Sequence, residues 1–135
     1  MSTKIFVNLP VADLEKSVDF FTQLGFTFNL QFTDENATCM IIADDSFVML
    51  LVKDFFASFT GKQVVDASTH TEVIVALSAE SRAGVDTLVN AALAAGGAPS
   101  QWAMDQDGMY GRSFQDLDGH LWEVMWMDPS TIQAG

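Results

Sequence analysis

The chain has 135 residues, 49% of them hydrophobic, which is enough for one domain with a packed core. Eighteen acidic residues against six basic ones give a net charge of −12, which disfavours nucleic acid and anionic membrane surfaces as partners. The longest wholly apolar run, FVMLLV, is too short to cross a bilayer, and MSTKIFVNLP lacks the pattern of a signal peptide. A single cytoplasmic domain over residues 1–135 is therefore expected.

The first half of the chain predicts a strand, a helix and three further strands. KIFVNL, at residues 4–9, has the composition of a strand. Asp13 can cap the helix that follows, whose apolar residues recur at helical spacing, and Gly25 stands where that helix should end. Extended segments then follow at residues 27–33, 37–43 and 46–53.

The second half predicts the same order of elements. TEVIVALS, at residues 71–78, reads as a strand, and the apolar residues after it recur at helical spacing up to Gly96 and Gly97. Extended segments follow at residues 99–104, 109–115 and 120–126. The chain thus predicts two βαβββ repeats, about 4–53 and about 72–127. Because a repeat of about 65 residues buries little surface by itself, the two sheets should pair with each other, or with those of another chain, around shared apolar surface.

We interpret two potentially reactive side chains, Cys39 and His120, as structural and not as functional residues. Cys39 is the lone cysteine, so it cannot form an internal disulfide, and it lies in the apolar run TCMII. We therefore expect it in the core. His120 adjoins a turn and points to the side opposite Glu123, so we expect a packing or strand-end residue.

A carboxylate, Glu123, lies in the run DLDGHLWEVMW, which otherwise reads as a buried strand. A carboxylate taken out of water needs a partner, a metal or a wet cavity. Strand alternation places Glu123 on one face and Trp122 on the other. When the two repeats are overlaid from their last turns, Leu50 falls on Glu123.

The turn at Asp118 and Gly119 decides what lies opposite Glu123, because a shift of one residue exchanges the faces of a strand. With a two-residue turn, Arg112 would share the face of Glu123 and form an ordinary salt bridge with it. With a three-residue turn and a bulge, Ser113 would lie opposite and leave space for a cavity. The residues by themselves support the two registers equally.

Two segments resemble the paired signatures of a known superfamily. LPVADLEKSVDFFTQLGF and MYGRSFQDLDGHLWEV are similar to those of the vicinal oxygen chelate superfamily, which contains glyoxalase I, bleomycin resistance proteins, fosfomycin-resistance enzymes and extradiol dioxygenases. More narrowly, the chain resembles small bacterial predicted lactoylglutathione lyases. The resemblance covers residues 4–127 and implies an α+β fold in which two βαβββ repeats form a cup-shaped mixed sheet. That family usually has proline at the position of Leu117, which favours the three-residue turn and directs Glu123 into the cup.

The resemblance also locates a metal site and shows that most of its ligands are missing here. Metal-dependent members hold a divalent ion with one side chain from the first and last strand of each repeat. The corresponding residues are Phe6, Leu50, approximately Ile74, and Glu123. Three of these cannot ligate a metal, so no cofactor is expected. A weaker alternative is a displaced divalent metal site. It would use Glu123, Glu72, His70 and Asn8.

Three functions are compatible with these features. The first is metal-independent binding of a small, cationic or aromatic molecule in the cup by a homodimer, as the likeness to bleomycin resistance proteins implies. The expected ligand-contacting residues are Glu123, Ser113, Asn8, Leu50, Phe6 and Glu72. The second is a lyase or isomerase of the lactoylglutathione lyase type with Glu123 as catalytic base. The third is a dimerisation module whose cup is filled by its own side chains.

Overall fold

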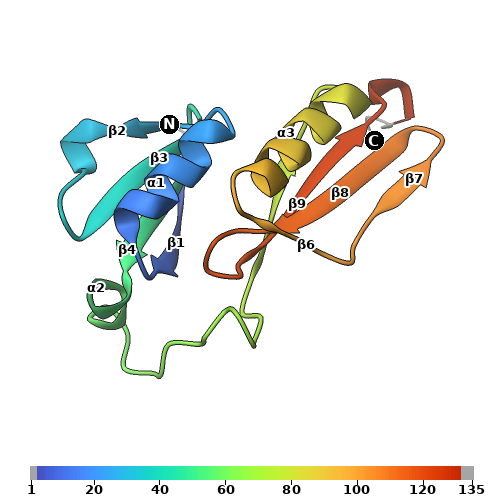
Figure 1. Cartoon of the computed structure of the whole chain (residues 1–135). Helices are drawn as coiled ribbons and strands as arrows, with labels where there is room; N and C mark the ends of the chain where they lie inside the picture. The colour runs from blue at the N-terminus through green and yellow to red at the C-terminus, as the bar shows by residue number, and fades with distance from the viewer. Residues whose placement is uncertain (1–2, 132–135) are drawn as a thin grey trace. The chain divides into compact units, whose positions relative to one another are not determined.

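The chain forms two compact units that divide between Val65 and Asp66 (Figure 1). The computed structural model describes residues 3–131. Each unit is a mixed sheet with a helix lying across one face, which confirms the predicted α+β class. The predicted grouping of both repeats into one domain stays a prediction.

The first unit has the expected βαβββ order. Its elements are β1 (Ile5–Val11), α1 (Leu14–Gln23), β2 (Thr27–Asn29), β3 (Ala37–Ala43) and β4 (Ser46–Val52), in the sheet order β1-β4-β3-β2. Asp13 caps α1 as predicted, because its carboxylate accepts a hydrogen bond from the backbone N–H of Lys16 at 3.1 Å. The strand predicted over residues 27–33 stops early. Asn29 accepts a hydrogen bond from the backbone N–H of Gln31 at 3.0 Å and begins a short 3-10 turn instead, η1 (Leu30–Phe32).

The second unit repeats this order with one strand broken in two. Its elements are β5 (Ile74–Ser78), α3 (Arg82–Ala94), β6 (Ala98–Pro99), β7 (Met104–Gln106), β8 (Met109–Gln115) and β9 (Leu121–Met127), followed by η2 (Pro129–Thr131). The sheet order is β5-β9-β8-β6, and β7 also pairs with β8. The prediction of a continuous strand over residues 99–104 is wrong. The chain leaves the sheet after Pro99, which has no N–H to donate to a ladder.

A short helix that the sequence pattern did not predict, α2 (Lys53–Ala57), follows β4.

Each unit has its own buried core. In the first unit, fully buried side chains of the sheet include Leu9, Val48 and Leu50, and those of α1 are Phe20 and Phe21. In the second unit they are Phe114, Trp122 and Val124 from the sheet and Val85, Val89 and Ala92 from α3. Cys39 is buried, as expected, and burial raises the pKa of its thiol.

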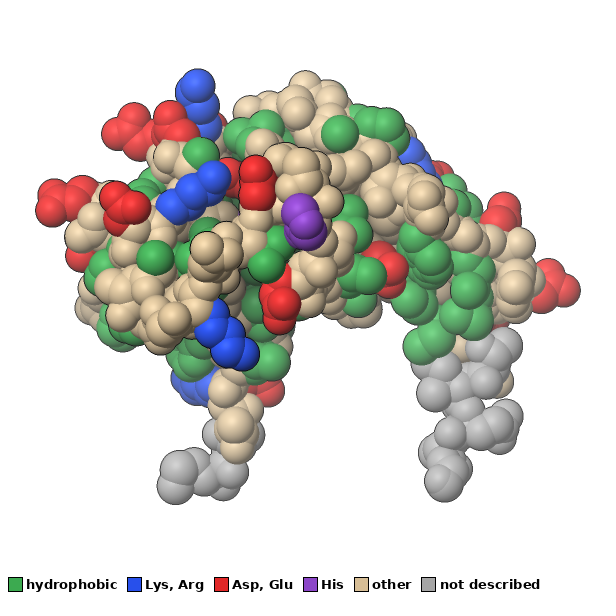
Figure 2. Space-filling model, turned by 90° about the horizontal axis from the view of Figure 1, so that it is seen from below, with side chains coloured by type: hydrophobic (Ala, Val, Ile, Leu, Met, Phe, Trp, Pro, Cys, Tyr) green, Lys and Arg blue, Asp and Glu red, His purple; other side chains and the backbone are tan. Residues whose placement is uncertain are grey.

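The acidic side chains do not mark out one binding surface on the face seen in Figure 2. They are spread there among neutral and hydrophobic side chains. Arg82 forms an ion pair with Asp105 at 2.8 Å, and Arg112 forms one with Asp86 at 2.9 Å. Within the same residues, no helix is both long and apolar enough to span a bilayer.

Candidate functional site

The turn between β8 and β9 has the three-residue form. The backbone N–H of Gly119 donates to the carbonyl of Asp116 at 3.1 Å, and the backbone N–H of Asp116 donates to the carbonyl of His120 at 3.0 Å. Gly119 has a φ of +91°, the left-handed conformation that this turn requires at its last residue. The turn therefore sets the register of the two longest strands of the second unit.

In this register Ser113 pairs with Glu123, as the three-residue turn predicts. Arg112 projects from the opposite face of β8, and its guanidinium lies 2.9 Å from the carboxylate of Asp86 in α3. A hydrogen bond from the Tyr110 hydroxyl, together with Arg112, holds the pKa of the Asp86 carboxyl below its ordinary value. Arg112 therefore pairs with a residue of α3. The salt bridge between Arg112 and Glu123 that a two-residue turn would have allowed is not formed.

Glu123 lines an open cavity of about 670 Å³ in the second unit. The floor of the cavity is the sheet face that carries Glu123 and Ser113, and its walls are formed by residues 67–71 and 99–102. Glu123 is half-buried there. His70 is the other titratable residue on the lining, which includes no lysine or arginine. The cavity therefore carries a carboxylate and neither a lysine nor an arginine to neutralise it.

The sequence pattern did not predict the wall at residues 67–71. Asp66 begins it with a local turn, because its carboxylate accepts hydrogen bonds from the backbone N–H and hydroxyl of Ser68 at 3.0 and 2.7 Å. This wall lies directly against the β8–β9 turn, since a Cβ on Gly119 would come within 2.7 Å of the carbonyl oxygen of Ala67. The signal available in the sequence was the Asp-x-Ser pattern at residues 66–68, which is typical of such turns.

The overlay of Leu50 on Glu123 is wrong by one residue. A two-residue turn at residues 44–45 joins β3 to β4, whereas a three-residue turn joins β8 to β9. An overlay that aligns the first residues of the two turns therefore shifts the strand after the turn by one residue and exchanges its faces. Leu50 is fully buried and faces the core of the first unit. Met49, whose parallel partner in β1 is Asn8, corresponds to Glu123. Leu50 is therefore not available to a ligand on the open face.

The remaining expected ligand-contacting residues are not part of this cavity lining. Phe6 and Asn8 are exposed on β1 of the first unit, where Phe6 stacks on Phe47 with ring centroids 4.9 Å apart. Asn8 donates its side-chain amide to the carbonyl of Phe6 at 3.2 Å. Glu72 is exposed, precedes β5 and does not line the cavity. Of the expected set, the second unit brings Ser113 and Glu123 together, and the roles of all these residues stay predictions.

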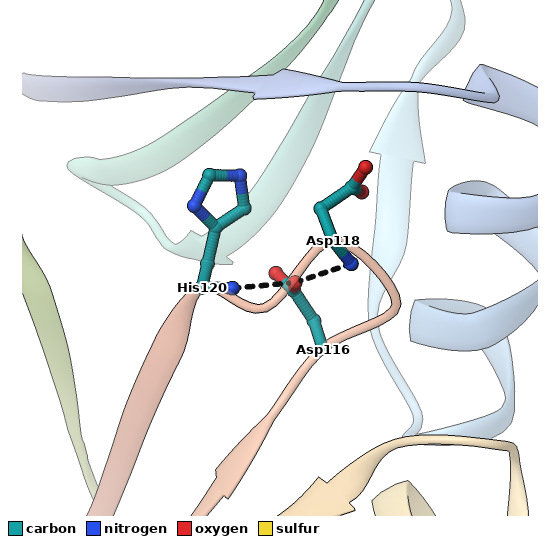
Figure 3. A group of neighbouring side chains, drawn as sticks. All are labelled: Asp116, Asp118 and His120. Carbon is teal, nitrogen blue, oxygen red and sulfur yellow. Dashed lines mark hydrogen bonds between the residues drawn. The ribbon is translucent and has the colours of Figure 1, made fainter. Parts of the chain in front are cut away.

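The acidic and histidine residues of the alternative, displaced metal site do not lie close enough together to share an ion. Within residues 3–131, the three metal-binding side chains that lie within 4.8 Å of one another are instead Asp116, Asp118 and His120 (Figure 3). Glu123, Glu72 and His70 form no such group. His120 is 7% exposed, consistent with the packing position expected for it.

Hydrogen bonds hold the Asp116 carboxylate of this group in place. One oxygen of the Asp116 carboxylate accepts the backbone N–H groups of Asp118 and His120, each at 3.0 Å (Figure 3). The other oxygen accepts the indole N–H of Trp122 at 2.9 Å. Burial raises the pKa of the Asp116 carboxyl, against the opposing effects of His120 and of these hydrogen bonds. The Asp116 carboxylate is therefore the hydrogen-bonded centre of the turn.

Comparisons with known proteins place this architecture in a family. A model of the bleomycin resistance protein-like N-terminal family matches residues 3–43. The structure of hypothetical protein SA1046 from S. aureus is 32% identical, with a TM-score of 0.77, and the match covers 93% of this chain and 95% of that one. No curated protein matches the sequence.

Two further solved structures share the fold at lower identity. A glyoxalase/bleomycin resistance protein/dioxygenase family enzyme from Burkholderia phytofirmans is 15% identical with a TM-score of 0.74, over 92% of this chain and 98% of that one. A lactoylglutathione lyase from Agrobacterium tumefaciens is 16% identical with a TM-score of 0.66, over 93% of each chain. With its two βαβββ units and these matches, the chain belongs to the vicinal oxygen chelate superfamily, which includes the glyoxalase/bleomycin resistance/dioxygenase proteins.

Proposed function

We propose that the protein binds a small cationic molecule in the cavity of its second unit, without a metal, and that Glu123 supplies the counter-charge. The position of Glu123 carries the proposal. Its carboxylate lines the cavity, and within residues 3–131 no side chain forms an ion pair or hydrogen bond with it. A homodimer, which the family resemblance implies, belongs to the same proposal.

The physical reason is the cost of an unpaired charge away from bulk water. A half-buried carboxylate has lost part of its hydration. A cation in the cavity would compensate for that loss, because the attraction between opposite charges is stronger in a surrounding that is less polar than water. Apolar side chains of Ile74 and Leu121 and amide groups of Gln101 and Gln115 also line the cavity. Such a mixture of apolar surface and a few polar groups is typical of small-molecule sites.

Calorimetric titration of the metal-free protein with benzyltrimethylammonium and with benzyl alcohol tests the proposal. We expect the cation to bind at least about tenfold more tightly than the neutral compound, because only the cation can pair with Glu123. Its affinity should fall as sodium chloride is added, since salt screens a partly exposed charge pair. Equal affinities, or no binding of any compound in a wider panel of aromatic cations, would contradict the proposal.

We also expect the purified protein to hold no stoichiometric nickel, zinc, iron or manganese, and to gain no lactoylglutathione lyase activity when these ions are added. At the positions corresponding to the family's ligands, Phe6 and Ile74 carry only carbon and hydrogen and Met49 a thioether, none of which suits a hard divalent ion. Elemental analysis and an assay with the methylglyoxal–glutathione adduct measure both. One tightly bound metal per chain together with turnover would overturn this expectation.

A lyase or isomerase with Glu123 as general base is the second candidate. The observation that favours it is that His70 lines the same cavity, which provides a second group able to transfer a proton. The Nδ1 atom of His70 lies 2.8 Å from the hydroxyl of Thr69, which helps to orient the ring. Metal-independent proton exchange at a carbon beside a carbonyl, lost in Glu123→Gln, would support this candidate over simple binding.

A further inference from the structure

Trp102 is the largest side chain on the cavity wall formed by residues 99–102. It lies where the chain leaves the sheet between β6 and β7 (Figure 1). Because this stretch has no ladder partner, strand pairing does not fix the position of the indole. Two residues of the neighbouring strand β8 contact Trp102 instead: Gly111 lies against the indole, and Ser113 contacts the backbone carbonyl.

Gly111 provides the space that the indole occupies. A Cβ at this residue would lie 2.4 Å from Cη2 and 2.6 Å from Cζ3 of Trp102, far closer than two carbon atoms can approach. Gly111 has no positive φ, so the backbone conformation does not require glycine there. The close approach of the ring is therefore the reason for a glycine inside this strand.

Ser113 fixes the backbone of the same segment. Its hydroxyl donates a hydrogen bond to the carbonyl oxygen of Trp102 at 2.6 Å, and the residue is 8% exposed. The hydroxyl proton is thus directed at the wall and not at the cavity. Gly111 and Ser113 are two residues apart on one strand, so they project from the same sheet face as Glu123.

We infer that Gly111 and Ser113 are positioning residues for Trp102, and that Trp102 is a specificity-determining residue that selects flat aromatic cations for the cavity. This inference rests on the proposed binding function, because it concerns the same cavity. The indole offers a planar apolar face, and Glu123 offers a charge on the same lining. A ligand with a positive charge on a flat ring system can use both, whereas a cation on a puckered ring can use only the charge.

The first arm of the test needs no ligand. The chain contains three tryptophans, so three indole N–H resonances can be followed by NMR and the Trp102 signal assigned with Trp102→Phe. We expect Gly111→Ala and Ser113→Ala to shift the Trp102 resonance, with the Trp126 resonance unchanged, and to increase the quenching of tryptophan fluorescence by acrylamide. Gly61→Ala is the matched control, because an added Cβ there meets nothing within 4 Å. An unmoved Trp102 resonance in both variants would overturn the positioning roles.

The second arm measures selectivity with two probes of equal charge, 1-methylquinolinium and trimethylcyclohexylammonium. We expect Trp102→Leu to weaken the flat probe about tenfold and to leave the puckered probe within about twofold, because only the flat probe stacks on the indole. Gly111→Ala should reduce the same selectivity, which a merely structural change would not do. Trp126→Phe, at an aromatic residue outside the lining, should leave it unchanged.

The outcomes separate this inference from the proposed function. If Trp102→Leu lowers both affinities alike, or neither, while Glu123→Gln still weakens both probes, the specificity role is overturned and cation binding stands. If neither these probes nor any aromatic cation of the wider panel binds the wild type, the proposed function and the specificity role are both overturned. The shift of the Trp102 resonance then decides whether Gly111 and Ser113 position the indole.

Discussion

Glu123→Gln should weaken a cationic ligand by about 2 to 5 kcal/mol, or roughly thirtyfold to several thousandfold in affinity, if the charge pair is fully desolvated. Glutamine keeps the shape of the side chain and removes only its charge. Because Glu123 is half-buried, the lower part of that range is expected. A carboxylate on an open surface would contribute less than about 1 kcal/mol to such a pair. Calorimetric titration of the two proteins with benzyltrimethylammonium measures the difference.

Glu80→Gln is the matched control for this measurement. Glu80 is exposed, belongs to the same unit and lies outside the cavity lining, so the substitution changes the net charge equally without changing the site. We expect its affinity for the cation to stay within about twofold of the wild type, because a distant exposed charge is screened. Equal losses in both variants would assign the effect to net charge, and no loss in Glu123→Gln would make Glu123 a structural residue.

Asp116→Asn should lower the free energy of unfolding by about 1 to 3 kcal/mol, the usual effect of leaving a buried donor unsatisfied. The asparagine oxygen can still accept the backbone N–H groups of Asp118 and His120. Its NH₂ group, however, would face the indole N–H of Trp122, so that two donors meet where a donor and an acceptor met before. Asp116→Ala removes all three acceptor contacts and should cost more. Urea denaturation followed by circular dichroism measures both losses.

A double-mutant cycle isolates the bond to the indole. Trp122→Phe removes the donor, so Asp116→Asn should cost less in that background than in the wild type. Asp107→Asn, at an exposed residue of the β7–β8 turn, changes the same functional group without a buried partner and should alter stability by less than about 0.5 kcal/mol. Equal costs of Asp116→Asn in the two backgrounds would show that the Trp122 contact contributes nothing.

The local elements of this protein could be read from its sequence because their signals are local. Asp13 at the start of α1 and Gly96 at the end of α3 act within one turn of their own helix. The repeated order of elements gave the α+β class in the same way. The three-residue turn at residues 117–119 could be preferred only with help from the family resemblance, and the pairing of Ser113 with Glu123 follows directly from that turn.

Comparison of the two repeats failed where their turns differ in length. The overlay from the last turn assumed equal turns, and the shorter turn at residues 44–45 turned Leu50 into the core and left Met49 at the corresponding position. Strand parity changes with each inserted residue, so an error of one residue reverses the assignment completely. Only the observed pairing of the strands could correct it.

The sequence by itself determined that the chain holds two βαβββ repeats and that Glu123 is a carboxylate on a strand with few means of holding a metal. The tertiary structure decided what surrounds that carboxylate. The walls at residues 67–71 and 99–102 lie far from Glu123 along the chain, and they reach it because Gly119 and Gly111 leave room for them. Contacts of this kind depend on how segments pack across a sheet face, which no local pattern of residue types records.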